Sequence, residues 1–232
     1  MHWTFVEQLR PDQIEITEGE AHHLLHVLRI KPQQMLVLFN GRGEIADAIV
    51  ESTSRRSVFC RVVQRREVPG LPEGWLTVAV SPPKGDRLRW MIEKLTELGV
   101  PRITLLGCER TVAEPGETKL EKLRGTAAAA CKQSRQAWLP DIQPLTNFGQ
   151  VLVEAGQLGQ KIVLAHPAAG RIHEPTPGGT GRLLLIGPEG GFTDTEVTAA
   201  LAAGAEQLHW PRSILRTETA AIVFAGRLLI SP

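Results

Sequence analysis

From Trp75 to the end of the chain, short apolar segments alternate with segments of helical periodicity, and this alternation strongly limits the possible folds. Apolar runs typical of buried strands cover residues 76–80, 103–106, 162–165, 183–186 and 208–210. Helical patterns cover residues 86–98, 119–134, 151–155, 194–203 and 217–229, and Thr193 with Glu196 forms a capping box before one of them. Strands that alternate with helices predict a parallel sheet covered on both faces, so we expect an α/β domain of about 158 residues.

The first seventy residues carry a different pattern, which predicts a β-rich module with one inserted helix. Short strands are expected at residues 5–6, 14–16, 35–39, 44–50 and 58–63, and a helix at residues 18–29. Residues 69–74 contain two prolines and two glycines and break both periodicities, as a linker does. We therefore expect two domains, at residues 1–72 and 73–232.

The composition is that of a soluble globular protein, with 42% hydrophobic and 22% charged residues. Cys60, Cys108 and Cys131 form no CxxC pair, which argues against a disulfide framework and against a cysteine zinc site. No apolar run reaches the roughly 18 residues of a membrane helix, and Glu7 interrupts any signal peptide. We expect a protein of the reducing cytoplasm with no membrane partner.

The formal net charge is +1, so the overall charge does not indicate a nucleic-acid partner. Two local stretches carry cations without any acidic residue. Residues 52–66 contain Arg55, Arg56, Arg61, Arg65 and Arg66, and residues 122–140 contain Lys122, Arg124, Lys132 and Arg135. They indicate two patches for a polyanion, with solvent-facing charge as an equally weighted alternative.

Histidines cluster in the expected first helix. His22 and His26 have the i, i+4 spacing that two metal ligands can use, but no third ligand is evident. We therefore expect no metal, and favour a structural or RNA-contacting role for these side chains.

Ligands of open parallel sheets bind beyond the carboxyl ends of the strands, so the loops after strands are the candidate sites. The loop at residues 81–86 has neither a GxGxxG nor a GxxxxGK[ST] pattern, which disfavours a dinucleotide-type or P-loop site. A glycine-rich loop comes late, at Gly187-Pro188-Glu189-Gly190-Gly191, between an expected strand and the capped helix. Its glycines allow the backbone to approach a ligand closely, and the alternative is a plain tight turn.

A second loop, at residues 211–221, also follows an expected strand and opens a helix. Ile214 and Leu215 could pack against a flat apolar ring, while Thr217 and Thr219 could form hydrogen bonds with its polar edges. The alternative is a plain N-cap by Thr217 with Glu218 in the first helical turn, and both interpretations are compatible.

These two loops together resemble the signature motifs of the RsmE family, small-subunit ribosomal RNA methyltransferases that modify a uridine at N3. The motifs are Gly187-Pro188-Glu189-Gly190-Gly191 and Ile214-Leu215-Arg216-Thr217-Glu218-Thr219-Ala220, in the same order and at the same spacing. Lys84-Gly85-Asp86-Arg87, residues 93–99, Glu109-Arg110, residues 132–135 and residues 22–29 agree as well. The resemblance covers nearly the whole chain.

The resemblance implies a C-terminal SPOUT-type α/β domain with a trefoil knot that binds S-adenosylmethionine, and an N-terminal PUA-like β-barrel for RNA. It further implies a cytoplasmic homodimer whose substrate is 16S rRNA or the small ribosomal subunit. Two alternatives stay open: a methyltransferase for another RNA target, such as tRNA or a ribose 2′-hydroxyl, and a non-catalytic RNA-binding protein.

The candidate site residues follow from the resemblance and the two loops. Those expected to bind the cofactor are Leu164, His166, Ile186, Gly187, Glu189, Gly190, Gly191, Ile214, Leu215, Thr217 and Thr219. For catalysis we expect Arg216 to stabilise the uridine anion, with Arg110 and Arg135 as alternatives that a partner subunit could supply, and Glu218 or Glu189 to accept the proton. Those expected to contact RNA are Arg29, Arg55, Arg56, Arg65, Arg66, Lys84, Arg87, Lys132 and Arg135.

Overall fold

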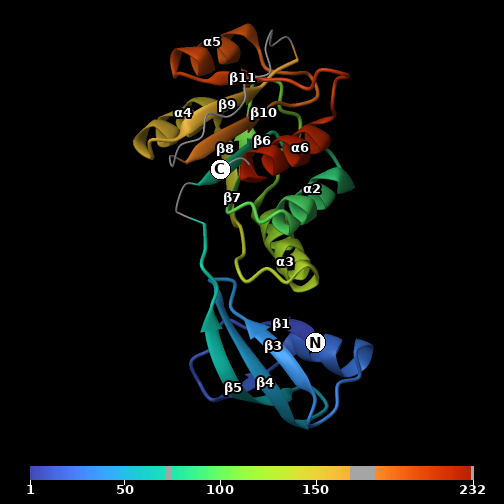
Figure 1. Cartoon of the computed structure of the whole chain (residues 1–232). Helices are drawn as coiled ribbons and strands as arrows, with labels where there is room; N and C mark the ends of the chain where they lie inside the picture. Colours follow the sequence, from blue (N-terminus) through green and yellow to red (C-terminus); the bar gives the residue numbers. More distant parts are fainter. Residues whose placement is uncertain (72–74, 168–180, 231–232) are drawn as a thin grey trace. The chain divides into compact units, whose positions relative to one another are not determined.

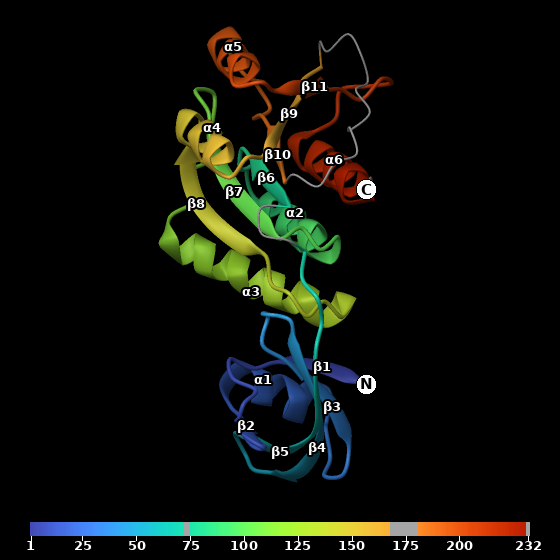
Figure 2. The same ribbon diagram turned by 60° about the vertical axis from the view of Figure 1, so that its left-hand side comes forward.

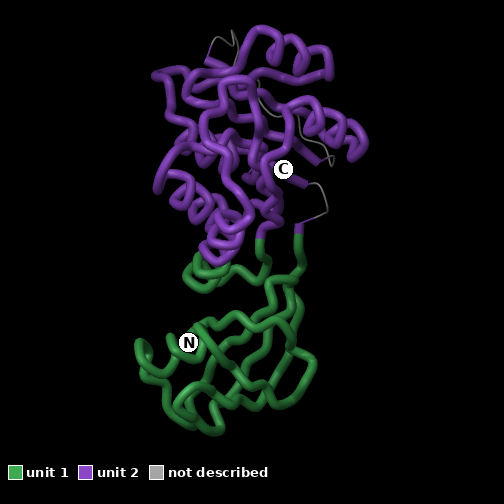
Figure 3. The backbone as a smooth tube through the Cα atoms, turned by 180° about the vertical axis from the view of Figure 1, so that it is seen from behind, with its two compact units in different colours: residues 1–70, 128–139 green, residues 71–127, 140–232 purple. Residues whose placement is uncertain are grey.

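The computed structural model describes residues 1–71, 75–167 and 181–230. The chain forms two compact units (Figure 3). The first contains residues 1–70 and 128–139, and the second contains residues 71–127 and 140–232. Residues 128–139 include the C-terminal end of helix α3 (Glu117–Ser134), so the first unit draws on two separate parts of the chain, which the sequence analysis did not predict.

The first unit contains a five-stranded sheet with the order β1-β3-β4-β5-β2. Its strands are β1 (His2–Phe5), β2 (Gln13–Ile16), β3 (Met35–Phe39), β4 (Glu44–Thr53) and β5 (Val58–Glu67). β1 pairs with β3 in parallel, and the other neighbours are antiparallel. Among the described residues no ladder joins the edge strands β1 and β2, so the sheet is an open half-barrel.

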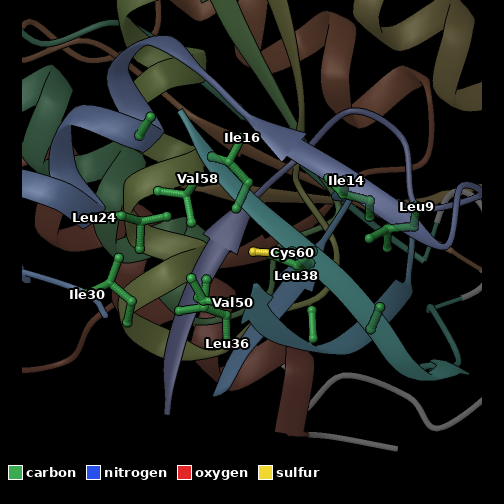
Figure 4. Close-up of a cluster of buried hydrophobic side chains, with 13 residues drawn as sticks. Leu9, Ile14, Ile16, Leu24, Ile30, Leu36, Leu38, Val50, Val58 and Cys60 are labelled. Atoms are coloured by element: carbon green, nitrogen blue, oxygen red, sulfur yellow. The ribbon is translucent and has the colours of Figure 1, made fainter. Parts of the chain in front are cut away.

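The helical segment of the first unit is shorter than its periodicity predicts and is divided into an α-helix and a π-helix. A single helix is expected at residues 18–29, but α1 (Glu18–His22) runs into a π-helix, η1 (His23–Val27). Leu24 of η1 packs with Leu36, Val50, Val58 and Cys60 of the sheet in a buried cluster (Figure 4). Alternate residues of β5 face this core, which is the period that a half-buried strand requires.

A second core in the first unit depends on residues 128–139. Cys131 and Ala137 pack against Val37, Phe39 and Ile45. The indole Nε1 of Trp138 donates a 2.9 Å hydrogen bond to the carbonyl of Val68, and Leu139 N donates to the carbonyl of Gly41 at 2.9 Å. Side chains from β3 and β4 are therefore buried by a segment about ninety residues further along the chain.

The second unit is a six-stranded parallel sheet with the order β11-β9-β10-β6-β7-β8 (Figure 1). Its strands are β6 (Leu76–Val80), β7 (Arg102–Gly107), β8 (Asp141–Asn147), β9 (Lys161–Ala165), β10 (Arg182–Ile186) and β11 (Glu206–Leu208). The described helices include α2 (Asp86–Glu97), α4 (Phe148–Gln157), α5 (Asp194–Ala202) and α6 (Thr217–Ile230). The expected parallel α/β fold is confirmed. β8 was not predicted, and the trefoil knot stays a prediction.

The central strands of this sheet are covered on both faces, as their continuous apolar sequences predict. Every residue of β6 and β10 is buried. Leu183 and Leu185 of β10 pack in one core with Phe148 and Val151 of α4 and Ala200 of α5. Helix α6 contacts β6, β10 and α2, and α2 and α6 lie across the sheet from α4 (Figure 2).

We predict that Trp138→Ala in the full chain destabilises the first unit by about 2 kcal/mol, because it removes the hydrogen bond to Val68 and the indole that packs on Gly43 and Gly70. Hydrogen exchange of the β3 and β4 amides measures this effect. Trp90→Ala is the matched control, since Trp90 of α2 is similarly exposed but belongs to the second unit. Equal loss of β3 protection in both variants would contradict the role of Trp138.

Candidate active site

The glycine-rich loop joins β10 to α5, and its geometry favours glycine at two positions. A Cβ added at Gly187 would lie 3.1 Å from the ring of Phe192, which is closer than side chains normally tolerate. Gly191 has a φ of +72°, in the left-handed region that favours glycine, and its N–H donates to the carbonyl of Pro188 at 2.8 Å. The loop is therefore a fixed turn with Glu189 and Gly190 exposed at its tip.

The predicted capping box at the start of α5 is confirmed, and its glutamate has a second role. Glu196 Oε2 accepts a 2.8 Å hydrogen bond from Thr193 N, while the hydroxyl of Thr193 accepts one from Glu196 N. The other carboxylate oxygen accepts a 2.9 Å hydrogen bond from Glu109 N, in the loop after β7. Glu196 is buried, so one carboxylate ties that loop to the end of the glycine-rich loop.

The loop after β7 makes further contacts that fix it at the carboxyl edge of the sheet. Arg110 Nη1 donates a 2.8 Å hydrogen bond to the carbonyl of Gly190. The hydroxyl of Thr111 accepts from Cys108 N at 2.8 Å and lies 2.9 Å from the hydroxyl of Ser81, which follows β6. Loops after β6, β7 and β10 are thus joined, at the edge where parallel sheets bind ligands.

Cys108 lies within this network but is not a reactive thiol. Burial, together with the nearby Glu196 charge, raises the pKa of Cys108 to about 12, so the nucleophilic thiolate is scarce at neutral pH. Burial also raises the pKa of Cys60 to about 11 and that of Cys131 to about 12. All three cysteines are free.

The structure brings the two motif loops together through Thr217. Thr217 is the first residue of α6 and is buried, and its hydroxyl donates a 3.2 Å hydrogen bond to the carbonyl of Gly187. The side chain therefore connects the two loops, beyond the plain capping role considered from the sequence. Of its neighbours, Leu215 and Thr219 are half-buried, while Ile214 is 83% exposed and Arg216 is exposed.

Two residues predicted to bind the cofactor have buried side chains. Leu164 of β9 is fully buried and packs in the core with Leu185 and Phe192. Ile186, the last residue of β10, is also buried. His166 lies after β9, and its N–H donates to the carbonyl of Leu208.

Arg87 joins the two carboxylates that the sequence analysis named as proton acceptors. Its Nη2 donates a 3.0 Å hydrogen bond to Glu189 Oε1, and its Nη1 lies 3.7 Å from Glu218 Oε2. Glu218 is 5% exposed, and its Oε2 has no hydrogen-bond partner in the described part of the chain. Arg87 is predicted to contact RNA, and in the structure its guanidinium lies against these two carboxylates.

The other predicted RNA contacts divide into paired and unpaired cations. Arg65 donates to the carbonyls of Leu9, Arg10 and Pro11 and pairs with Asp12. Arg66 pairs with Asp47, and Lys132 pairs with Glu20. Of the residues predicted to contact RNA, those with no ion pair to a described residue are Arg29, Arg55, Arg56, Lys84 and Arg135, and all five are exposed.

The rings of His22 and His26 lie next to each other, with centroids 4.7 Å apart. The described residues contain no group of three or more metal-ligating side chains. In the same residues, no helix is both long enough and apolar enough to cross a membrane.

Comparison with known proteins finds matches for both units. Residues 70–229 match the family model of an RNA methyltransferase domain, and residues 16–63 match that of an RNA methyltransferase PUA domain. Ribosomal RNA small subunit methyltransferase E of Mycobacterium bovis is 31% identical over 92% of this chain and 85% of its own length. The enzyme of the same name from Bacillus subtilis is 30% identical over 94% of this chain and 92% of its own length.

Solved structures show the same fold. A probable rRNA-methyltransferase from Porphyromonas gingivalis superposes with a TM-score of 0.86 at 31% identity, covering 97% of this chain and 95% of that one. A Legionella pneumophila protein, solved in complex with the bound cofactor SAM, has a TM-score of 0.86 at 29% identity and covers 98% of this chain and 95% of that one. With these matches over both units, the chain belongs to the ribosomal RNA small subunit methyltransferase E family.

Proposed function

We propose that this protein transfers the methyl group of S-adenosylmethionine to N3 of a uridine in 16S rRNA. The observation that carries the proposal is the hydrogen bond from Thr217 to Gly187, which joins the two motif loops of a chain in this family. The solved Legionella relative, 29% identical, holds SAM. Small-subunit rRNA as substrate rests on the names of the relatives.

The residues of the site suit S-adenosylmethionine. Gly190 and Gly191 present backbone groups without side chains at a fixed turn, and the half-buried Leu215 and exposed Ile214 offer apolar surface for a flat ring. The buried carboxylate of Glu218 supplies negative charge beside a cationic ligand. When bound, this cofactor supplies an activated methyl group on a sulfonium.

The reaction requires the uridine to act as an anion. The new N3–C bond forms as the S–C bond breaks, the bonding pair stays on sulfur, and the N3 proton leaves. If the free imide has a pKa of about 9, holding it ionised at pH 7 costs about 3 kcal/mol. Arg216 is suited to offset this cost, because it is exposed next to Thr217 and has no ion pair among the described residues.

Glu218 is the better placed of the two carboxylates to receive a hydrogen bond from N3–H. Glu218 Oε2 is buried and lacks a hydrogen-bond partner within the described chain, whereas Glu189 is exposed. An oriented acceptor in a buried position contributes more than one in water. The proton passes from Glu218 to solvent after transfer.

RNA phosphates would be held by the five unpaired cations. Arg29 and Arg135 have φ values of 52° and 60°, a left-handed conformation that costs a non-glycine residue about 1 kcal/mol. Each keeps an exposed, unpaired guanidinium where glycine would be less strained, which supports a role for the side chain. Arg55 and Arg56 lie in the turn between β4 and β5, within the segment that matches the PUA model.

Self-association would use the outer face of α2 and α6, as expected for a homodimer. Trp90 of α2 and Leu98, the C-cap of that helix, are about two helical turns apart and are 45% and 40% exposed. Leu98 lies against Gly226 of α6, and Ile230, one turn further, is 84% exposed. Neighbouring exposed apolar side chains of this size favour an interface. A ribosomal substrate would place the protein in the cytoplasm.

The direct test uses two substrates, 16S rRNA and small ribosomal subunits, from a strain that lacks its own enzyme of this family. Each substrate is incubated with the protein and S-adenosylmethionine, and its nucleosides are then analysed by mass spectrometry. We expect one equivalent of 3-methyluridine in at least one substrate. A 2′-O-methylated nucleoside, or methylation of tRNA but not rRNA, would contradict the proposal.

We predict that Gly190→Arg abolishes S-adenosylmethionine binding without unfolding the protein. Gly190 is exposed at the tip of the loop. A Cβ added there would lie 3.3 Å from Cδ of Arg110, so the rest of a long side chain must extend into the space proposed for the ligand, and its positive charge repels the cationic cofactor. Titration calorimetry measures the affinity. Gly156→Arg is the control, since Gly156 is exposed on α4 with nothing within 4 Å of an added Cβ. Unchanged binding by Gly190→Arg would remove the loop from the site.

We predict that Arg216→Ala keeps the cofactor affinity within about tenfold, or 1.4 kcal/mol, and lowers the single-turnover methylation rate at least a hundredfold. The affinity is retained because the exposed guanidinium acts on the uridine and does not hold the cofactor. Arg212→Ala, in the same loop and also exposed, is the control. A variant with the wild-type rate would exclude Arg216 from the mechanism.

A further inference from the structure

We infer that Arg87 is a positioning residue that orients the Glu218 carboxylate for the substrate, and that it does not contact RNA phosphate. The inference rests on the proposed function. Arg87 lies in the first turn of α2, and its two Nη atoms reach Glu189 in the glycine-rich loop and Glu218 in α6. One planar guanidinium thereby connects three elements of the site.

The burial of Glu218 makes a positive neighbour necessary. Taking a carboxylate out of water costs several kcal/mol unless a charge or hydrogen-bond donors compensate. Arg87 is the only cation within 4 Å of Glu218 among the described residues, and Oε2 of Glu218 receives no hydrogen bond there. Arg87 therefore supplies charge compensation while leaving Oε2 able to accept a hydrogen bond.

The two distances indicate a division of roles between the carboxylates. The 3.0 Å hydrogen bond to exposed Glu189 fixes the guanidinium, whereas the 3.7 Å separation from Glu218 is too long for a hydrogen bond. Glu218 also follows Thr217, whose hydroxyl is bonded to Gly187. The buried oxygen thus lies in the helix that is bonded to the glycine-rich loop and receives no hydrogen bond from a described residue, and we assign that missing hydrogen bond to the imide N–H of a uracil.

The local charge argues against a phosphate contact at Arg87. The guanidinium of Arg87 has two carboxylates as direct partners, so its own charge is already balanced and is less available to a phosphate. Arg216 has no such neighbours among the described residues and stays available to an anionic substrate. The sequence places both arginines in family motifs, and their surroundings separate their roles.

The test is a double-mutant cycle with Arg87→Ala and Glu218→Gln, read as the single-turnover methylation rate of 16S rRNA. We expect Arg87→Ala to lower the rate at least tenfold, Arg87→Lys to recover part of it, and the double variant to be no slower than Glu218→Gln alone. RNA affinity and its salt dependence stay at the wild-type values for Arg87→Ala. Arg89→Ala, on the same helix and exposed, is the matched control and keeps the wild-type rate.

Additive losses in the double variant, or an unchanged rate in Arg87→Ala, would overturn the inference. So would weaker RNA binding with a salt slope reduced by about one, which the loss of one phosphate contact produces. The Arg55→Ala, Arg56→Ala double variant, which removes two such contacts, should reduce the slope by about two. If Arg87→Ala does not fold, the same cycle is run with Arg87→Lys and judged by the same criterion. A wild-type protein that forms no 3-methyluridine contradicts the proposed function instead, so the two failures are distinct.

Discussion

The Glu196 carboxylate holds the candidate site together, because it accepts hydrogen bonds from two loops that are far apart in the sequence. Its oxygens bind Thr193 N and Glu109 N, and hydrogen bonds to a charged acceptor contribute about 2 kcal/mol each. With the loop after β7 fixed in this way, Arg110 reaches the carbonyl of Gly190. The glycine-rich loop therefore has a defined shape before any ligand arrives, which lowers the cost of binding.

The elements that the sequence predicts are those whose signals are local. The apolar runs of β6 and β10 and the capping box of α5 specify their structure within a few residues, and all three are confirmed. β8 lacks such a signal, because Pro144 interrupts it and forces the register shift opposite Thr104 and Leu105. The pattern at residues 18–29 predicts a helix but does not distinguish an α-helix from the π-helical turn at η1.

Features that depend on distant residues were not predictable from the sequence. No local pattern indicates that Cys131 and Ala137 complete the core of the first unit. Similarly, residues 52–66 lack acidic side chains, but the sheet brings Glu51, Asp47 and Asp12 against Arg61, Arg66 and Arg65. A basic stretch in the sequence is thus largely neutralised in space. The roles of the candidate site residues remain predictions, although the structure places the two motif loops in contact.

The surroundings of each arginine therefore indicate more about its role than its position in a motif. Arg65 donates from Nε and Nη2 to three carbonyls, which makes it a structural tie between β5 and the segment before β2. Arg87 compensates a buried carboxylate, and Arg216 is exposed with no ion pair in the described chain. Stabilising an anion that forms only during the reaction requires a guanidinium that is not already neutralised, because a paired arginine must first give up its partner. Arg216 meets this condition and Arg87 does not, so the two arginines suit opposite tasks at one site.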